Sequence, residues 1–286
     1  MSIALHRSQL VFQKTERALL TLSSGQNAES VHGFRTTSRR LQTLLEQLLP
    51  ERERNQKKLL KMLNRIRRRA GKVRDLDVQL AALRSLKIPQ EPRRKTQLMQ
   101  GLIELRVKQE KKLRKLLTKD VIRELRKRLK RGAKELRPET SRDALTVARS
   151  MVNEIVRPAG PVTEDLLHQY RIVVKRARYA AEFAPKSAEA TRLIGQLKLL
   201  QDAVGNWHDW LTLTQAASKR LGDVNQSSLV AALHNVTGGK FRHAVAALSA
   251  SPTVHPAAKP VSINTEQSRK ITTKSPTLVE RIESAA

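Results

Sequence analysis

Apolar residues recur along most of the chain at the three- and four-residue spacing that marks one face of an α-helix. Two clear examples are the runs Leu41, Leu44, Leu45, Leu48 and Leu193, Leu197, Leu200, Val204. The strict alternation of apolar and polar residues that is typical of β-strands is scarce. The pattern therefore predicts an all-α fold.

Residues that interrupt helices divide this pattern into segments. The expected breaks are Ser23-Ser24-Gly25, Pro50, Gly71, Pro89 to Pro92, Pro138, Pro158 to Pro161, Pro185, Gly205, Gly222 and Gly238-Gly239. They predict roughly eight to ten helices. Because the connections are short, neighbouring helices should be antiparallel and should pack in bundles.

The composition changes at about Ser251. Residues 251–286 are rich in Pro, Ser, Thr and Ala, and their apolar residues are sparse and aperiodic. Such a segment cannot bury enough apolar surface to fold, so we predict a helical domain over 1–250 and a disordered tail over 251–286. The tail holds five basic and three acidic residues, so most of the positive charge belongs to the helical domain.

Charge is the strongest compositional feature. The 286 residues include 56 Lys or Arg and 26 Asp or Glu, for a formal net charge of +30. An imbalance of this size indicates an anionic partner: nucleic acid, polyphosphate or an acidic membrane surface. The absence of cysteine excludes disulfides, thiolate metal sites and cysteine nucleophiles.

Nothing in the sequence predicts insertion into a membrane. No apolar stretch near Met1 is long enough for a signal peptide. No apolar run reaches about 18 residues anywhere in the chain, so no membrane-spanning helix is expected. We therefore expect a cytoplasmic protein, and the sequence leaves its oligomeric state open.

The most basic segment runs from residue 106 to residue 137. It contains fifteen Lys or Arg and four acidic residues. The acids stand at helical spacing from basic residues, as in Glu110 and Arg114, so part of the segment should be an ion-paired, solvated helix face. The remaining charge should still add to the positive field of the domain.

An internal repeat links two distant segments of the chain. Residues 32–40 and 168–176 both read His-x-x-Arg-x-x-x-(Arg/Lys)-Arg, 136 residues apart, and Glu46 matches Glu182 at that offset. A second pair, residues 71–75 and 205–209, follows at an offset of 134. We infer two similar halves, about 1–135 and 140–250. Duplicated halves tend to pack about a pseudo-two-fold axis, which would bring the two motif helices face to face.

On a helix, each motif presents a row of donors opposite an apolar face. His32, Arg35 and Arg39 fall within about 60° of one another, and Phe34 and Leu41 point the other way. In the second copy, the shared face holds His168, Arg171, Lys175, Arg178, Tyr179 and Glu182. Arginine grips two phosphate oxygens with a planar fork, and lysine supplies a compact charge. A row that advances about 10 Å suits an extended anion better than a single phosphate.

A basic stripe opposite an apolar stripe is usually only the solvated face of an amphipathic helix. The duplication, the shared histidine and the net charge favour a binding site here. Asp75 and Asp209 are interpreted as structural residues that cap a helix or orient a neighbouring arginine. Trp207 and Trp210 are interpreted as core residues.

These motifs resemble the CHAD family, the conserved histidine α-helical domain. The matching segments are residues 32–40, 71–77 (GKVRDLD), 168–182 (HQYRIVVKRARYAAE) and 197–209 (LKLLQDAVGNWHD), and the resemblance covers roughly residues 1–250. It implies two four-helix bundles related by pseudo-two-fold symmetry around a basic central channel. It also implies binding of inorganic polyphosphate and, for some members, residence at polyphosphate granules.

Carried over position by position, the resemblance implies a channel lined by His32, Arg35, Arg39, Arg40, Arg74, His168, Arg171, Lys175, Arg176, Arg178, Tyr179 and Lys198. One departure concerns His208, which stands where the first half has Arg74. Many relatives also carry a CYTH domain with a Glu-x-Glu-x-Lys strand motif. The stretch 51–55 (ERERN) lacks that Lys and lies in helical sequence, so we expect a stand-alone CHAD module.

Two other classes of function compete with this reading. A metal-dependent enzyme is disfavoured because His32 and His168 stand among arginines, which repel cations, and no carboxylate cluster, nucleophile elbow or P-loop is present. We expect no cofactor, no metal and no catalysis. A sequence-nonspecific nucleic-acid binder stays open, because charge alone permits it. Only 3% of residues are Phe, Trp or Tyr, which limits base stacking, so weak nucleic-acid binding is expected as a secondary property.

Overall fold

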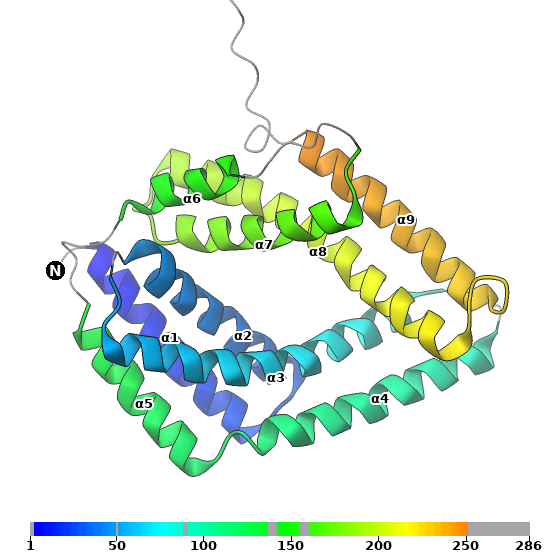
Figure 1. Ribbon diagram of the computed structural model, residues 1–286, viewed down its shortest axis with the longest axis horizontal. Helices are drawn as coiled ribbons and strands as arrows, with labels where there is room; N and C mark the ends of the chain where they lie inside the picture. Colours follow the sequence, from blue (N-terminus) through cyan, green and yellow to red (C-terminus); the bar gives the residue numbers. More distant parts are fainter. Residues whose placement is uncertain (1–2, 50, 88–90, 137–141, 155–160, 251–286) are drawn as a thin grey trace, which may run out of the picture. The chain divides into compact units, whose positions relative to one another are not determined.

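The computed structural model describes residues 3–49, 51–87, 91–136, 142–154 and 161–250, and all regular structure within them is helical. The helices of these residues are α1 (Ile3–Ser24), α2 (Ala28–Thr43), α3 (Arg54–Ser85), α4 (Pro92–Arg114), α5 (Lys119–Lys134), α6 (Ala144–Asn153), α7 (Glu164–Ala181), α8 (Ala188–Leu221) and α9 (Ser228–Ser249) (Figure 1). A π-helical turn, η1 (Leu44–Leu48), follows α2 directly. The all-α prediction is confirmed. The predicted disordered tail, 251–286, lies outside the described residues.

Several of the predicted breaks coincide with helix ends. Gly25 lies between α1 and α2, Pro185 lies between α7 and α8, and Pro92 opens α4 at a position that needs no N–H donor. Gly222 ends α8 with a φ of 89°, a left-handed conformation that favours glycine. The breaks expected at Pro50, Pro138 and residues 158–160 fall outside the described residues.

Other predicted breaks were wrong. Gly71 lies inside α3, Gly205 inside α8, and Gly238-Gly239 inside α9. A helical glycine costs about 1 kcal/mol relative to alanine, and the packing of buried residues on both sides outweighs that cost. Conversely, the basic segment 106–137 is not one helix. It is interrupted after Arg114, and α5 begins where the Thr118 side chain accepts a hydrogen bond from the Val121 N–H.

The helices pack with their neighbours along the chain. In the first half, α1 packs on α2 and α5, and α3 packs on α2, α4 and α5; in the second half, α6, α7, α8 and α9 pack in sequence. In the described part of the chain, the first half thus contains five helices, α1 to α5, and the second half contains four, α6 to α9. The halves meet where α2 packs on α7 and where α3 and α4 pack on α8.

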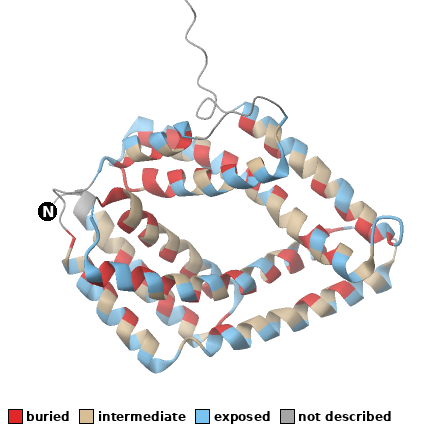
Figure 2. Ribbon diagram, viewed as in Figure 1, coloured by how far each residue is buried: buried red, intermediate tan, exposed pale blue. Residues whose placement is uncertain are grey.

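Buried residues recur along the helices (Figure 2). Their apolar side chains form two clusters. The larger cluster joins both halves and includes Phe34, Leu41 and Trp207, each of them fully buried. The smaller cluster lies at the far ends of α3 and α8 and at the start of α9, with Leu80, Leu213 and Leu229. The interpretation of Trp207 as a core residue is confirmed, and Trp210 packs against the smaller cluster.

Candidate functional site

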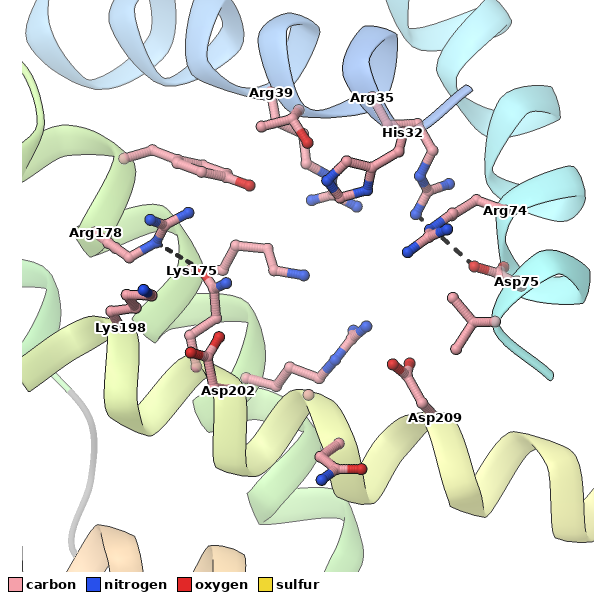
Figure 3. A pocket seen from close by; sticks show the side chains of 17 residues that line it. His32, Arg35, Arg39, Arg74, Asp75, Lys175, Arg178, Lys198, Asp202 and Asp209 are labelled. Atoms are coloured by element: carbon pink, nitrogen blue, oxygen red, sulfur yellow. Dashed lines mark hydrogen bonds and ion pairs between the residues drawn. The ribbon is translucent and has the colours of Figure 1, made fainter. Parts of the chain in front are cut away.

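A cavity of about 520 Å³ lies between the two motif helices and the two long helices that follow them. Its lining comes from α2, α3, α7 and α8 (Figure 3). The lining residues are His32, Arg35, Thr36, Arg39, Arg74, Asp75, Val78, Arg171, Lys175, Arg178, Tyr179, Lys198, Gln201, Asp202, Gly205, Asn206 and Asp209. Seven are Lys or Arg and three are Asp, so the cavity is strongly basic.

Local sequence explains how α2 presents its basic row. Asn27 caps the helix by accepting the Ser30 N–H at 2.8 Å, and Phe34 and Leu41 are fully buried. Burial of this apolar face fixes the rotation of α2, so that His32, Arg35 and Arg39 face the cavity.

Arg35 reaches across to α3. Its guanidinium lies against Gly71, where a Cβ would collide with the Arg35 Nη1. Nη2 forms an ion pair with Asp75 at 3.8 Å. Asp75 lies in the middle of α3, so it does not cap a helix. Its ion pair with Arg35 corresponds to the other predicted role, which is to orient a neighbouring arginine.

The cations of the cavity are crowded. Burial, followed by repulsion from Arg171, Arg39 and Arg35, lowers the pKa of Lys175 to about 7. Burial is also the main cause that lowers the pKa of Arg35 and of Arg171, and Arg39 lowers both further. Like charges so close together destabilise one another unless an anion lies between them.

The pKa values of His32 and Asp209 are also shifted by burial and by the neighbouring cations. Partial burial, followed by Arg74, Arg35 and other cations, lowers the pKa of His32. Burial raises the pKa of Asp209, although Arg171 and Lys175 oppose that rise. The carboxylates present therefore leave the cavity short of negative charge.

Glu182 holds the two motif helices together beside the cavity. It accepts from the Arg40 Nε of α2 at 2.6 Å and forms an ion pair with the Arg178 Nη1 of α7 at 2.8 Å. Both guanidinium groups also lie over the Tyr179 ring, at 5.6 Å for Arg40 and 5.0 Å for Arg178 from its centroid. Arg178 additionally donates to Gln201 at 2.9 Å, which fixes its position over α8.

The cavity lining contains most of the residues expected at a channel. It includes His32, Arg35, Arg39, Arg74, Arg171, Lys175, Arg178, Tyr179 and Lys198. Arg40, His168 and Arg176 lie outside it. Glu182 engages Arg40, His168 packs on His208 at a ring-centroid distance of 5.2 Å, and Arg176 is exposed on α7.

His208 does not replace Arg74 in the cavity. It packs between His168 and Trp207, and burial, followed by Arg171, lowers its pKa to about 4. Arg74 consequently has no cationic counterpart from α8 at this position.

The sequence reasoning missed the polar part of the lining that α8 supplies. Gln201, Asp202 and Asn206 face the cavity together with Lys198. Lys198, Gln201, Gly205 and Asp209 follow the spacing of one helix face, so the signal was present in the sequence. Among the described residues, no group of three or more His, Cys, Asp or Glu could hold a metal ion.

Comparison with known proteins adds the family. The family model for the CHAD domain matches residues 4–218. The chain belongs to the CHAD domain family. A search of curated proteins found no match.

Solved structures share the fold at low sequence identity. The CHAD domain from the plant Ricinus communis is 17% identical with a TM-score of 0.60, and the match covers 87% of this chain and 89% of that one. PptA from Streptomyces chartreusis is 14% identical with a TM-score of 0.61, and the match covers 89% and 98% of the two chains. Identities this low support the fold alone. In the part of the chain that the structure describes, no helix is long and apolar enough to cross a membrane.

Proposed function

We propose that this CHAD domain binds inorganic polyphosphate in the cavity between α2, α3, α7 and α8. The observation that carries the proposal is the packing of Lys175 among Arg35, Arg39 and Arg171, with too few carboxylates to neutralise them. A chain of phosphates would supply the missing charge and accept several charge-assisted hydrogen bonds at once.

The shape of the donor set favours an extended anion. His32 and Arg39 are two turns apart on α2, a rise of about 10 Å, and Arg171 and Arg178 are equally spaced on α7. Donors from two other helices, including Arg74 and Lys198, complete the lining. In this proposal the two halves, related by pseudo-two-fold symmetry, form one basic channel.

Nucleic acid is the rival ligand. Tyr179 is the one Phe, Tyr or Trp on the described lining, and the guanidinium groups of Arg40 and Arg178 already lie over its ring, so little surface is left for base stacking. Weak nucleic-acid binding on outer basic surfaces is compatible with the proposal.

A catalytic role has less support. Asp75 and Asp209 are engaged with cations of the site, and the described residues offer no metal cluster for phosphoryl transfer. We propose a binding protein that acts in the cytoplasm, and residence at polyphosphate granules would follow from binding the polymer itself.

The test compares three arginine variants. Arg35→Ala and Arg171→Ala each remove one half-buried cavity cation, whereas Arg176→Ala removes an exposed cation of the same helix as Arg171 but outside the cavity. The first two should each weaken binding roughly tenfold to a hundredfold, because a charge-assisted contact contributes about 1.5–3 kcal/mol. Arg176→Ala should change affinity by about twofold or less, since salt screens an exposed charge.

The measurement is a polyphosphate titration followed by competition with duplex DNA at equal phosphate concentration. Preference for polyphosphate supports the proposal. Equal losses in all three variants, or a preference for DNA, would contradict it.

A further inference from the structure

A second pocket lies where α1 and α2 meet the connection between α7 and α8. Its volume is about 400 Å³. The lining residues are Arg7, Leu10, Val11, Lys14, Thr37, Arg40, Glu182, Phe183, Ala184, Pro185, Lys186, Ala190, Thr191 and Ile194. This described lining shares no residue with that of the cavity. Glu182 separates the two sites, because it bonds to Arg40 of the pocket and to Arg178 of the cavity.

The pocket differs from the cavity in being largely apolar. Half of its described lining residues are apolar, and Phe183, Ala184 and Ala190 among them are buried. Ile194 packs against the larger apolar cluster. On the described lining of the cavity, Val78 is the one aliphatic side chain. An inorganic phosphate chain has no apolar surface to place against such a lining, so the pocket fits a ligand with an apolar body.

Helix α1 places two cations on either side of an apolar centre. Arg7 and Lys14 are two turns apart, about 10 Å along the helix and within about 20° around it, and Leu10 lies between them. The Arg7 guanidinium donates to the carbonyl of Ala184, which joins α1 to the connection after α7. Lys186 follows in the same connection and also lines the pocket. Cations from both halves of the fold therefore border the apolar lining.

The acid of the pocket does not neutralise these cations. Glu182 is the one Asp or Glu on the described lining, and it is already bonded to Arg40 and Arg178. Within the described part of the chain, neither Lys14 nor Lys186 has a hydrogen bond or an ion pair. An exposed lysine is usually only solvated, but these two border an apolar pocket. A molecule with an alkyl chain and an acidic group would satisfy both kinds of surface at once.

We propose that this pocket binds a small amphipathic anion, a medium-length alkyl chain with one terminal acidic group. The alkyl chain lies on the apolar lining, and the acidic group is held by Lys14, Lys186 and the remaining N–H groups of Arg7. The volume of about 400 Å³ is within the range of ligand pockets, roughly 300–1,000 Å³. This inference is independent of polyphosphate binding, since the two sites have different linings.

The experiment is a calorimetric titration of the whole chain with decanoate, below the concentration at which it forms micelles. Two comparison ligands separate the contributions of charge and chain: butyrate has the acidic group and little alkyl chain, and decyltrimethylammonium has the chain and a positive charge. From hexanoate to decanoate, each added methylene should raise affinity about fourfold, because it buries more apolar surface. Butyrate should give no measurable binding. Decyltrimethylammonium should bind at least about tenfold more weakly than decanoate, because the cations of the pocket repel it.

Two variants change the pocket and one is a matched control. Lys14→Gln/Lys186→Gln should weaken decanoate binding about tenfold, because two charge contacts are lost. Lys108→Gln/Lys127→Gln removes two exposed lysines outside both sites, lowers the net charge equally and should change affinity by about twofold or less. Thr191→Phe adds a ring at an exposed position of the lining and should abolish binding by filling the pocket. All five positions are exposed, so circular dichroism and thermal unfolding should match the wild type.

Four results would overturn the inference. The first is no binding of decanoate by the wild type, and the second is an equal loss of affinity in the two lysine variants. The third is unchanged binding by Thr191→Phe, which would place the ligand elsewhere. The fourth is displacement of decanoate by excess tripolyphosphate, which would place it in the cavity. Failure of the proposed function has a different signature, because decanoate binding would persist while Arg35→Ala and Arg171→Ala left tripolyphosphate affinity unchanged.

Discussion

The guanidinium of Arg35 lies directly against Gly71, one helix away, in the space that a side chain at position 71 would occupy. Because Gly71 has no Cβ, Arg35 of α2 can reach Asp75 and the cavity. A residue of one repeated motif thus depends on a residue of the other.

Gly71→Ala should consequently weaken polyphosphate binding. The new Cβ displaces the Arg35 guanidinium, so a charge-assisted contact of about 1.5–3 kcal/mol is lost or distorted, which corresponds to roughly tenfold to a hundredfold in affinity. The displaced group is the flexible end of a side chain, so the fold should tolerate the change. Affinity and thermal unfolding of the variant are the measurements.

The matched control is Gly195→Ala in α8, where a Cβ would meet nothing within 4 Å. This change should stabilise the helix by up to about 1 kcal/mol and leave affinity unaltered. Wild-type binding by Gly71→Ala would show that the Arg35 position does not matter.

Binding should depend on pH through Lys175. Its pKa in the unliganded cavity is about 7, and bound phosphate favours the charged ammonium, so binding raises that pKa and takes up a proton. Affinity should be highest below pH 7 and should fall as pH rises above about 7, by up to about tenfold per pH unit. Polyphosphate titrations at several pH values between about 6 and 9, at constant salt, measure this pH profile of affinity.

Lys175→Arg should flatten this profile, because arginine stays charged across the range. His32→Gln should leave the profile above pH 7 in place, since the environment lowers the pKa of His32 below its usual value. The reverse pattern would assign the pH dependence to His32 and not to Lys175.

The charge on Lys175 should also cost stability in the absence of ligand. Its folded-state pKa of about 7 lies below the ordinary lysine value, so the unfolded chain binds more protons between about pH 7 and 10. The free energy of unfolding contributed by this group therefore rises with pH across that window. Lys175→Met should raise the melting temperature most at or below pH 7, and the difference from the wild type should shrink toward pH 10.

Calorimetry of both proteins at several pH values tests this expectation. A difference in melting temperature that stays constant with pH would mean that Lys175 is not a strained cation. Loss of polyphosphate affinity by the same variant should accompany its gain in stability.

The salt dependence counts the cations that engage the ligand. Seven Lys or Arg line the cavity, so a ligand held there alone should give a slope of log affinity against log salt near −5, at roughly −0.7 per neutralised phosphate. A slope shallower than about −2 would show that only a few of these cations engage the ligand.

Periodicity in the sequence was enough to predict the all-α fold and the rotation of the motif helix α2. Phe34 and Leu41 are fully buried, so the basic residues opposite them face the cavity, as the helical wheel of the motif requires. A helical wheel does not predict which other helix packs against a given face. His168 shares a face with Arg171, yet it meets His208 of α8, and Arg40 is drawn to Glu182 of the other half.

The helix break predicted at Gly71 was wrong for a related reason. Gly71 was expected to end a helix because glycine is intrinsically unfavourable there. Its actual role, to leave room for Arg35, depends on a contact between residues far apart in the chain, which propensity does not encode.

The two apolar clusters are both tied to α3 and α8. Ala70 and Val73 belong to the larger cluster and Leu76 and Leu80 to the smaller, and on α8 Trp207 and Leu213 divide in the same way. Apolar packing thus anchors both helices on each side of the cavity and opposes their separation by the repulsion between its cations. A polyanion that enters finds its donors already in place and gives up little conformational entropy of the protein. By mass action, the abundance of phosphate polymer in the surroundings would then raise the free energy of unfolding of the protein.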